Sequence, residues 1–150
     1  MTLLADVRKW PTSRISPWFR RETLKATLRE AEIGYAWLGE SLGGYRPQGL
    51  GEASPNRGWR NESFRNYADY AMTKDFESGL AELISYADRE ILAVMCAEKL
   101  YTSCHRRIIS DYLVAYGYKV VHIIETGRLE PHKITRSAVI EDGVITYPRS

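Results

Sequence analysis

Apolar and polar positions along the chain predict strands and helices that follow one another in turn. Four segments rich in apolar residues predict buried strands, namely 3–7, 33–38, 91–96 and 119–124, and of these 91–96 is continuously apolar. Apolar residues three and four positions apart predict four amphipathic helices: 20–31, 64–71, 76–87 and 103–116. Gly117 directly follows the last helix, where glycine commonly ends a helix.

Two other segments complete the pattern. Glycines and prolines make 42–61 a long irregular loop, and such loops in compact domains are often functional. The segment 137–147 predicts a hairpin that turns at Asp142-Gly143. Strands alternating with helices predict one α/β domain over 1–150, with a mostly parallel sheet, flanking helices in a Rossmann-like layering and a C-terminal β-hairpin. The segment 91–96 is the strongest strand and is expected at the centre of the sheet.

Composition narrows the class of protein. No apolar run approaches the roughly 18 residues of a membrane helix, and 1–8 is too short and too soon charged for a secretory signal. We therefore expect a cytoplasmic protein with no membrane partner. The net charge of +2 is too small to indicate nucleic-acid binding by itself. Within 7–21, however, five basic residues and no acidic one predict a basic patch.

Arginine outnumbers lysine 15 to 6 along the chain. Guanidinium groups suit bidentate contacts with phosphate or carboxylate. A thermophilic or GC-rich source would produce the same bias, so both explanations stay open.

The polar residues that follow the predicted strands locate the candidate site. Ligands of open parallel sheets bind beyond the carboxyl ends of the strands. Three groups fall there: Asp6, Arg8 and Arg14 after the first strand, Gly43, Gly44 and Arg46 after the second, and Cys96 and Glu98 after 91–96. We expect the arginines to bind an anion, and Asp6 to hold Arg8 rather than act as a base.

The stretch VMCAEKLYTSCHRR contains both cysteines of the chain. Helical angles of 100° per residue place His105 in the middle of the apolar face of the next helix and Cys104 at its border. One hypothesis is a thiolate at Cys96 or Cys104 with His105 as its acid–base partner. The alternative is a buried histidine with two buried thiols, which is the commoner situation. A metal is not expected, because no standard zinc spacing is present.

The same residues carry a family resemblance. Seven groups of residues, in order along nearly the whole chain, resemble the signature of domain-of-unknown-function family 488: Asp6-Val7-Arg8 with Ser13-Arg14, Leu42-Gly43-Gly44, Gly58-Trp59-Arg60, Cys96-Ala97-Glu98, Cys104-His105-Arg106, His122-Ile123, and Glu130-Pro131-His132. The resemblance does not identify a reaction, and it leaves the cofactor unknown. It adds Arg60 and Arg106 to the candidate ligand-binding residues.

Two departures from the family pattern stand out. Members of the family usually begin with one more strand and helix, so either the start here is late or the sheet edge is completed by a partner chain in a homodimer. Tyr101 stands where the family commonly has proline, which predicts a less rigid loop between the cysteines.

These observations lead to one hypothesis and two alternatives. The leading hypothesis is an intracellular enzyme or sensor that binds an anionic, phosphate-bearing ligand, a nucleotide or a nucleic acid. Its reactive centre would be Cys96, Glu98, Cys104 and His105. The alternatives are a nucleic-acid-binding module without chemistry and a redox switch at Cys96 and Cys104.

Overall fold

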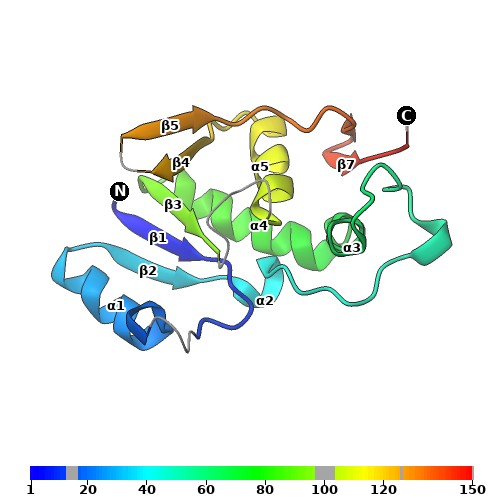
Figure 1. Cartoon of the computed structure of the whole chain (residues 1–150). Helices are drawn as coiled ribbons and strands as arrows, with labels where there is room; N and C mark the ends of the chain where they lie inside the picture. Colours follow the sequence, from blue (N-terminus) through cyan, green and yellow to red (C-terminus); the bar gives the residue numbers. More distant parts are fainter. Residues whose placement is uncertain (13–16, 97–103, 126, 150) are drawn as a thin grey trace. The chain divides into compact units, whose positions relative to one another are not determined.

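The computed structural model of the protein describes residues 1–12, 17–96, 104–125 and 127–149 (Figure 1). The chain divides into two compact units, each described below by itself. The first unit is Met1–Gly44 with Ser78–Ala97, and the second is Tyr45–Glu77 with Glu98–Ser150.

The first unit is built on a three-stranded parallel sheet in the order β2-β1-β3 (Figure 1). Its strands are β1 (Leu3–Asp6), β2 (Gly34–Trp37) and β3 (Leu92–Met95). In the register of the sheet, Asp6 lies opposite Trp37 on one side and opposite Met95 on the other. The three strands therefore end at one edge, which is the geometry that the sequence predicted for 3–7, 33–38 and 91–96.

Short and long helices follow these strands. The first unit contains η1 (Pro17–Phe19), α1 (Arg21–Glu30), α2 (Gly39–Leu42) and the part of α4 (Lys74–Ala87) from Ser78 onward. Every residue of β1 is buried, and so are Leu24 of α1 and Leu42 of α2. Burial of these apolar side chains is the main stabilising term of the unit.

The second unit is formed by helices and two hairpins. Its helical elements are η2 (Gly51–Ala53), α3 (Glu62–Tyr70), the start of α4 and α5 (Arg106–Ala115). Asn61 caps α3 by accepting a hydrogen bond from the backbone N–H of Phe64 at 3.2 Å. Gly117 follows α5 with a φ of +93°, and Tyr118 N–H donates back to Leu113, so the predicted glycine stop is confirmed.

Both hairpins of the second unit are antiparallel. Strand β4 (Val121–Glu125) pairs with β5 (Arg128–Pro131), and β6 (Val139–Glu141) pairs with β7 (Val144–Thr146). Asp142 and Gly143 join β6 to β7 with φ values of 51° and 78°. Two successive positive φ angles define the tight turn that the Asp-Gly pair predicted.

The core of the second unit is aromatic. Tyr67, Phe76 and Tyr112 are each at most 2% exposed, and the ring of Phe76 lies 6.1 Å from that of Tyr67 and 5.0 Å from that of Tyr112. Ile108 and Ile109 of α5 are buried in the same unit. These tilted and edge-on ring pairs are the arrangement that aromatic side chains prefer.

The α/β class, the parallel sheet, the amphipathic helices and the C-terminal hairpin are confirmed, and two expectations are wrong. The segment 91–96 is not central, because β1 lies between β2 and β3, and β3 is only half-buried. The strand predicted at 119–124 does form, but it pairs antiparallel with β5 instead of extending the parallel sheet. Its residues alternate, with His122 buried and Ile123 67% exposed, so only one face is covered.

The assignment of residues 1–150 to one domain and the Rossmann-like layering of its helices stay predictions. Within the described part of the chain, no helix has the length and apolar character required to cross a membrane.

Candidate functional site

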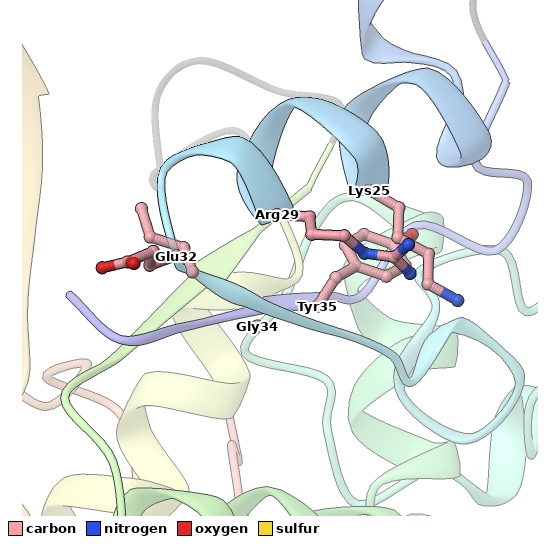
Figure 2. Close-up of a pocket in the computed structure, with 6 residues that line it drawn as sticks. Lys25, Arg29, Glu32, Gly34 and Tyr35 are labelled. Atoms are coloured by element: carbon pink, nitrogen blue, oxygen red, sulfur yellow. The ribbon is translucent and has the colours of Figure 1, made fainter.

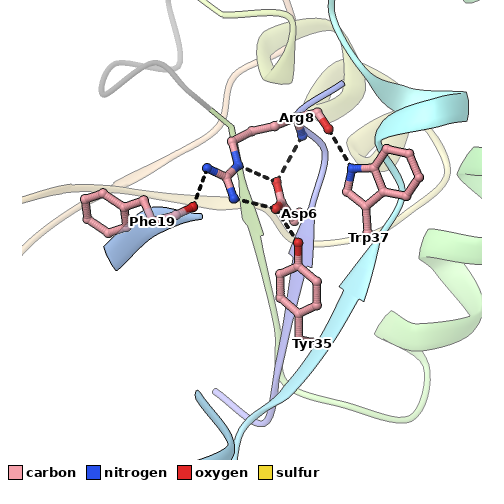
Figure 3. Close-up of polar contacts among 5 residues, drawn as sticks. All are labelled: Asp6, Arg8, Phe19, Tyr35 and Trp37. Carbon is pink, nitrogen blue, oxygen red and sulfur yellow. Dashed lines mark hydrogen bonds and ion pairs between the residues drawn. The ribbon is translucent and has the colours of Figure 1, made fainter. Parts of the chain in front are cut away.

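A buried ion pair between Asp6 and Arg8 lies at the carboxyl end of β1 (Figure 3). The Asp6 carboxylate accepts hydrogen bonds from Nε and Nη2 of Arg8 at 2.9 and 2.7 Å, and from the Arg8 backbone N–H at 3.1 Å. Asp6 is 0% exposed and Arg8 is 6% exposed. A bidentate contact of this kind fixes the guanidinium plane. The structure thus pairs the two residues, while ligand binding by either one stays a prediction.

Three further groups hold this pair (Figure 3). The Tyr35 hydroxyl donates a hydrogen bond to the Asp6 carboxylate. Trp37 Nε1 donates a hydrogen bond to the Arg8 carbonyl at 2.7 Å, and Arg8 Nη1 donates one to the Phe19 carbonyl at 2.8 Å. The hydrogen bond to Asp6 raises the pKa of Arg8, and burial together with Asp6 raises the pKa of the Tyr35 hydroxyl. Both groups therefore keep their protons at neutral pH.

The glycines after β2 allow close backbone packing. Gly43 is buried and directly follows α2. A Cβ atom at this position would lie 2.3 Å from the Gly39 carbonyl oxygen and 2.9 Å from Cβ of Lys9. Gly44 is half-buried. Gly43 thus has a packing reason to be glycine, whether or not it also binds a ligand.

The start of α5 brings together Cys104, His105 and Arg106. The Sγ atom of Cys104 lies 3.5 Å from Nδ1 of His105, and the Arg106 backbone N–H donates to the same sulfur at 3.4 Å. His105 is half-buried, and its ring centre lies 4.9 Å from that of Tyr67. A sulfur that receives a backbone N–H at a helix start lies where a thiolate would be stabilised.

Both cysteines are disulfide-bonded, and the described residues include no free thiol. Cys96 is 7% exposed and Cys104 is 4% exposed. A disulfide sulfur is not a nucleophilic thiolate. The predicted chemistry at Cys96 or Cys104 therefore requires reduction first.

The remaining predicted residues lie in different places. The Arg46 guanidinium lies 3.6 Å from the ring centre of Tyr70, and Arg106 is the half-buried first residue of α5. Arg60 is exposed and lines a cavity described below. Arg14 and Glu98 lie outside the described residues. Among the residues that are described, no group of three or more His, Cys, Asp or Glu side chains is arranged to hold a metal ion.

Sequence reasoning missed a buried network around Asp111 of α5. One carboxylate oxygen accepts from Nε2 of His132 at 2.7 Å and from the Thr135 backbone N–H at 3.0 Å, and the other accepts from the Tyr147 hydroxyl at 2.8 Å. Nδ1 of His132 lies 2.7 Å from Nε2 of His122. Because a carboxylate only accepts, a neutral His132 carries its proton on Nε2 and accepts at Nδ1 from His122.

The network has consequences for two pKa values. Burial, followed by the charges of His132 and Arg106, lowers the pKa of His122 to about 4. Burial and the neighbouring Asp111 raise the pKa of Tyr147. His122 is therefore neutral at pH 7 and resists protonation in the folded protein. The only sequence signal for this network was the resemblance, which included His122 and His132, because Asp111 is one of several polar positions on α5.

A second feature missed by sequence reasoning is an arginine-lined cavity of about 600 Å³ in the second unit. Its lining includes Arg57, Trp59, Arg60, Arg65, Ser137 and Arg149. No acidic side chain is among the described residues that line it. Arg57 and Arg60 lie in one loop and Arg65 in α3, but Arg149 comes from the other end of the chain. Only folding brings these charges together.

The first unit has a smaller cavity of about 310 Å³ between α1 and β2 (Figure 2). Lys25 and Arg29 of α1 point toward Tyr35 of β2, and Glu32 lies at the other end. The Tyr35 hydroxyl is already engaged by Asp6, and the acidic residue offsets part of the positive charge. This cavity is less suited to an anion than the arginine-lined one.

The fold and these sites define a small α/β protein with a buried ion pair at the ends of its parallel strands. The family model described as "Domain of unknown function DUF488" matches residues 1–113, so the chain belongs to this family. Neither the comparison with curated proteins nor the comparison with solved structures gives a match. The matched region includes Arg60 and Cys104, whereas His122, His132 and Arg149 lie beyond it.

The Asp6–Arg8 pair predicts the effect of removing one partner. The variant Arg8→Met leaves the Asp6 carboxylate buried without its counter-charge, and we expect the free energy of unfolding to fall by about 3–5 kcal/mol. The double variant Asp6→Asn/Arg8→Met should recover part of this loss, because the amide oxygen still accepts from Tyr35. Urea unfolding followed by circular dichroism measures both, with exposed Arg29→Met as control. A loss no larger than that of the control would contradict a structural role for Arg8.

His122 predicts a pH dependence of stability. Its folded pKa of about 4 lies below the usual 6.5, so between these values the unfolded chain binds more protons and acidification lowers the free energy of unfolding. In His122→Gln, whose amide can still donate to His132, this contribution disappears and the stability profile flattens between pH 6.5 and 4. Thermal unfolding across this range checks it, with Ile123→Gln on the same strand as control. An unchanged slope in His122→Gln would refute the assignment.

Proposed function

We propose that this protein binds a phosphate-bearing anion, a nucleotide or a nucleic acid, through the arginine-lined cavity of its second unit. The observation that carries the proposal is the convergence of Arg57, Arg60, Arg65 and Arg149 on one cavity of about 600 Å³. Small-molecule sites in proteins have volumes of roughly 300–1,000 Å³. The planar guanidinium group of arginine can donate two parallel N–H groups to two oxygens of one phosphate, which makes arginine well suited to phosphate recognition.

The charge of these arginines supports the proposal. Within the described part of the chain, the side chains of Arg60, Arg65 and Arg149 have no hydrogen-bond or ion-pair partner. Arg57 uses one donor, Nη2, on the Gly51 carbonyl at 3.1 Å. Like charges gathered without counter-charges repel one another, and an anion in the cavity relieves that repulsion. Arg60 is the one residue of this group that the sequence had already placed among the ligand-binding candidates.

The proposal keeps the remaining predicted ligand residues, Arg8, Arg14, Arg46 and Arg106, as candidates for further contacts. It also keeps a reactive centre of Cys96, Glu98, Cys104 and His105. The proximity of Cys104 Sγ to His105 Nδ1, at 3.5 Å, is what favours chemistry there. Under the alternative of a binding module without chemistry, ligand affinity is insensitive to substitution of either cysteine and falls steeply with salt.

A redox switch at Cys96 and Cys104 is the second candidate function. It is favoured by the disulfide-bonded state of both cysteines and by the backbone N–H that Arg106 directs at Cys104 Sγ. A sulfur at a helix start leaves readily as a thiolate, which makes its disulfide easier to reduce.

Binding of an anion through the cavity is testable by substitution of Arg65. In Arg65→Gln the side chain keeps its polarity and loses its charge, and we expect the affinity for inorganic pyrophosphate to fall about tenfold. The matched control is Arg128→Gln, an exposed arginine of β5 in the same unit that does not line the cavity. Isothermal titration calorimetry at two salt concentrations measures both variants. Equal losses in both variants, or none in either, would contradict a specific site.

The redox candidate predicts a mass change. Treatment of the purified full chain with dithiothreitol should raise its intact mass by two daltons, because reduction of one disulfide adds two hydrogen atoms. Removal of the reductant and addition of oxidised glutathione, which takes up the two electrons and two protons as its own disulfide is reduced, should reverse the change. A mass that stays constant under both treatments would exclude the switch, and Cys104→Ser serves as the control that has no disulfide to reduce.

A further inference from the structure

The arginine-lined cavity also carries information on which phosphate compounds fit it, provided that the proposed function holds. The geometry points to a small ligand with a chain of two or three phosphate groups, recognised through those phosphates and not through a base. We propose this ligand class for the cavity. The proposal follows from three observations on the residues that line the cavity. These are their positive charge, the contacts that Trp59 already makes, and the hydrogen bonds that hold the backbone beside Trp59.

The charge of the lining exceeds that of a single phosphate group. Four guanidinium groups present four positive charges, and no acidic side chain among the described lining residues reduces that number. A phosphate monoester carries about −1.5 to −2 at pH 7, so one phosphate neutralises at most half of the positive charge of the lining. Two or three linked phosphates match it. Ser137 adds a hydroxyl that can donate to a further phosphate oxygen.

The ring of Trp59 is already engaged by neighbouring side chains. Its indole ring stacks on Phe64 with ring centres 4.9 Å apart and planes 15° apart, and Tyr147 packs against it at 5.2 Å. The Arg107 guanidinium lies 5.0 Å from the same ring. Trp59 is the only aromatic residue among the described residues that line the cavity. Proteins that read single-stranded nucleic acid use open aromatic platforms, and here the platform is already occupied.

The wall that carries Trp59 is held rigidly. Gly58 N–H donates to the Tyr147 carbonyl at 2.7 Å, and Tyr147 N–H donates to Asn56 Oδ1 at 2.9 Å. A Cβ atom at Gly58 would lie 2.7 Å from the Tyr147 oxygen and 2.8 Å from the Pro148 oxygen. The Tyr147 hydroxyl is in turn bonded to Asp111. These bonds fix the backbone directly before Trp59, so the ring is held where it packs against Phe64 and Tyr147.

The inference is tested by a series of probes on the full chain at constant ionic strength and without divalent cations. The probes are inorganic phosphate, pyrophosphate, tripolyphosphate, ADP and CDP, measured by isothermal titration calorimetry. We expect pyrophosphate to bind at least about tenfold more tightly than phosphate, since each added phosphate gains charge-assisted hydrogen bonds. ADP and CDP should bind within about threefold of each other, because the base makes no stacking contact.

The outcomes separate this inference from the proposed function. If no probe binds, or if Arg65→Gln and Arg128→Gln bind every probe as the wild type does, the proposed function fails. If phosphate and pyrophosphate bind equally and Arg65→Gln weakens both, the anion site stands and the phosphate-chain inference falls. A tenfold preference between ADP and CDP also overturns the inference, and so does an oligonucleotide that binds more tightly than tripolyphosphate.

Discussion

The buried carboxylate of Asp111 is the interaction on which the second unit depends most. It accepts hydrogen bonds from His132 Nε2, from the Thr135 backbone N–H and from the Tyr147 hydroxyl. One side chain of α5 therefore connects the helix to the segment that follows β5 and to the segment that follows β7. Tyr147 is also the residue whose backbone binds Asn56 and Gly58 beside the arginine-lined cavity. An ionised carboxylate in a protein interior is tolerated only when hydrogen bonds replace its water. The cavity wall thus takes its position from a buried carboxylate that is not among the described residues lining the cavity.

The first unit uses the same principle at the end of β1. There the buried carboxylate is Asp6, and its partners are Arg8 and Tyr35. The bond from Trp37 to the Arg8 carbonyl then ties the end of β2 to the backbone after β1. Polar residues at the end of a strand therefore stabilise the fold, in addition to being candidates for a functional site. Arg8 is held in a buried ion pair, whereas Arg60, which sequence pattern alone did not single out, faces a cavity.

Several elements were predictable because local rules determine them. The apolar face of α5 and the glycine after it, the Asp142-Gly143 turn and the buried β1 all follow from periodicity and turn chemistry. The position of β3 was not predictable in the same way. Apolar character indicates that a strand is covered, but not which strands pair with it, and β3 pairs with β1 alone among the described strands. The antiparallel pairing of β4 was missed for a related reason, since its partner β5 is exposed along its whole length and has no continuous apolar run.

The candidate sites also differ in how far the sequence predicts them. By itself the sequence determined the four longer helices, strands β1 to β4, the C-terminal hairpin, the pairing of Asp6 with Arg8 at the carboxyl end of β1, and the membership of the family through ordered motifs, because each depends on neighbours in the chain. Tertiary structure alone decided the Asp111–His132–His122 network and the cavity in which Arg149 joins Arg57 and Arg65. Those residues lie far apart in the sequence and interact only across folded elements. Electrostatic and hydrogen-bonding contacts depend on distance in space, and no periodicity along the chain encodes that distance.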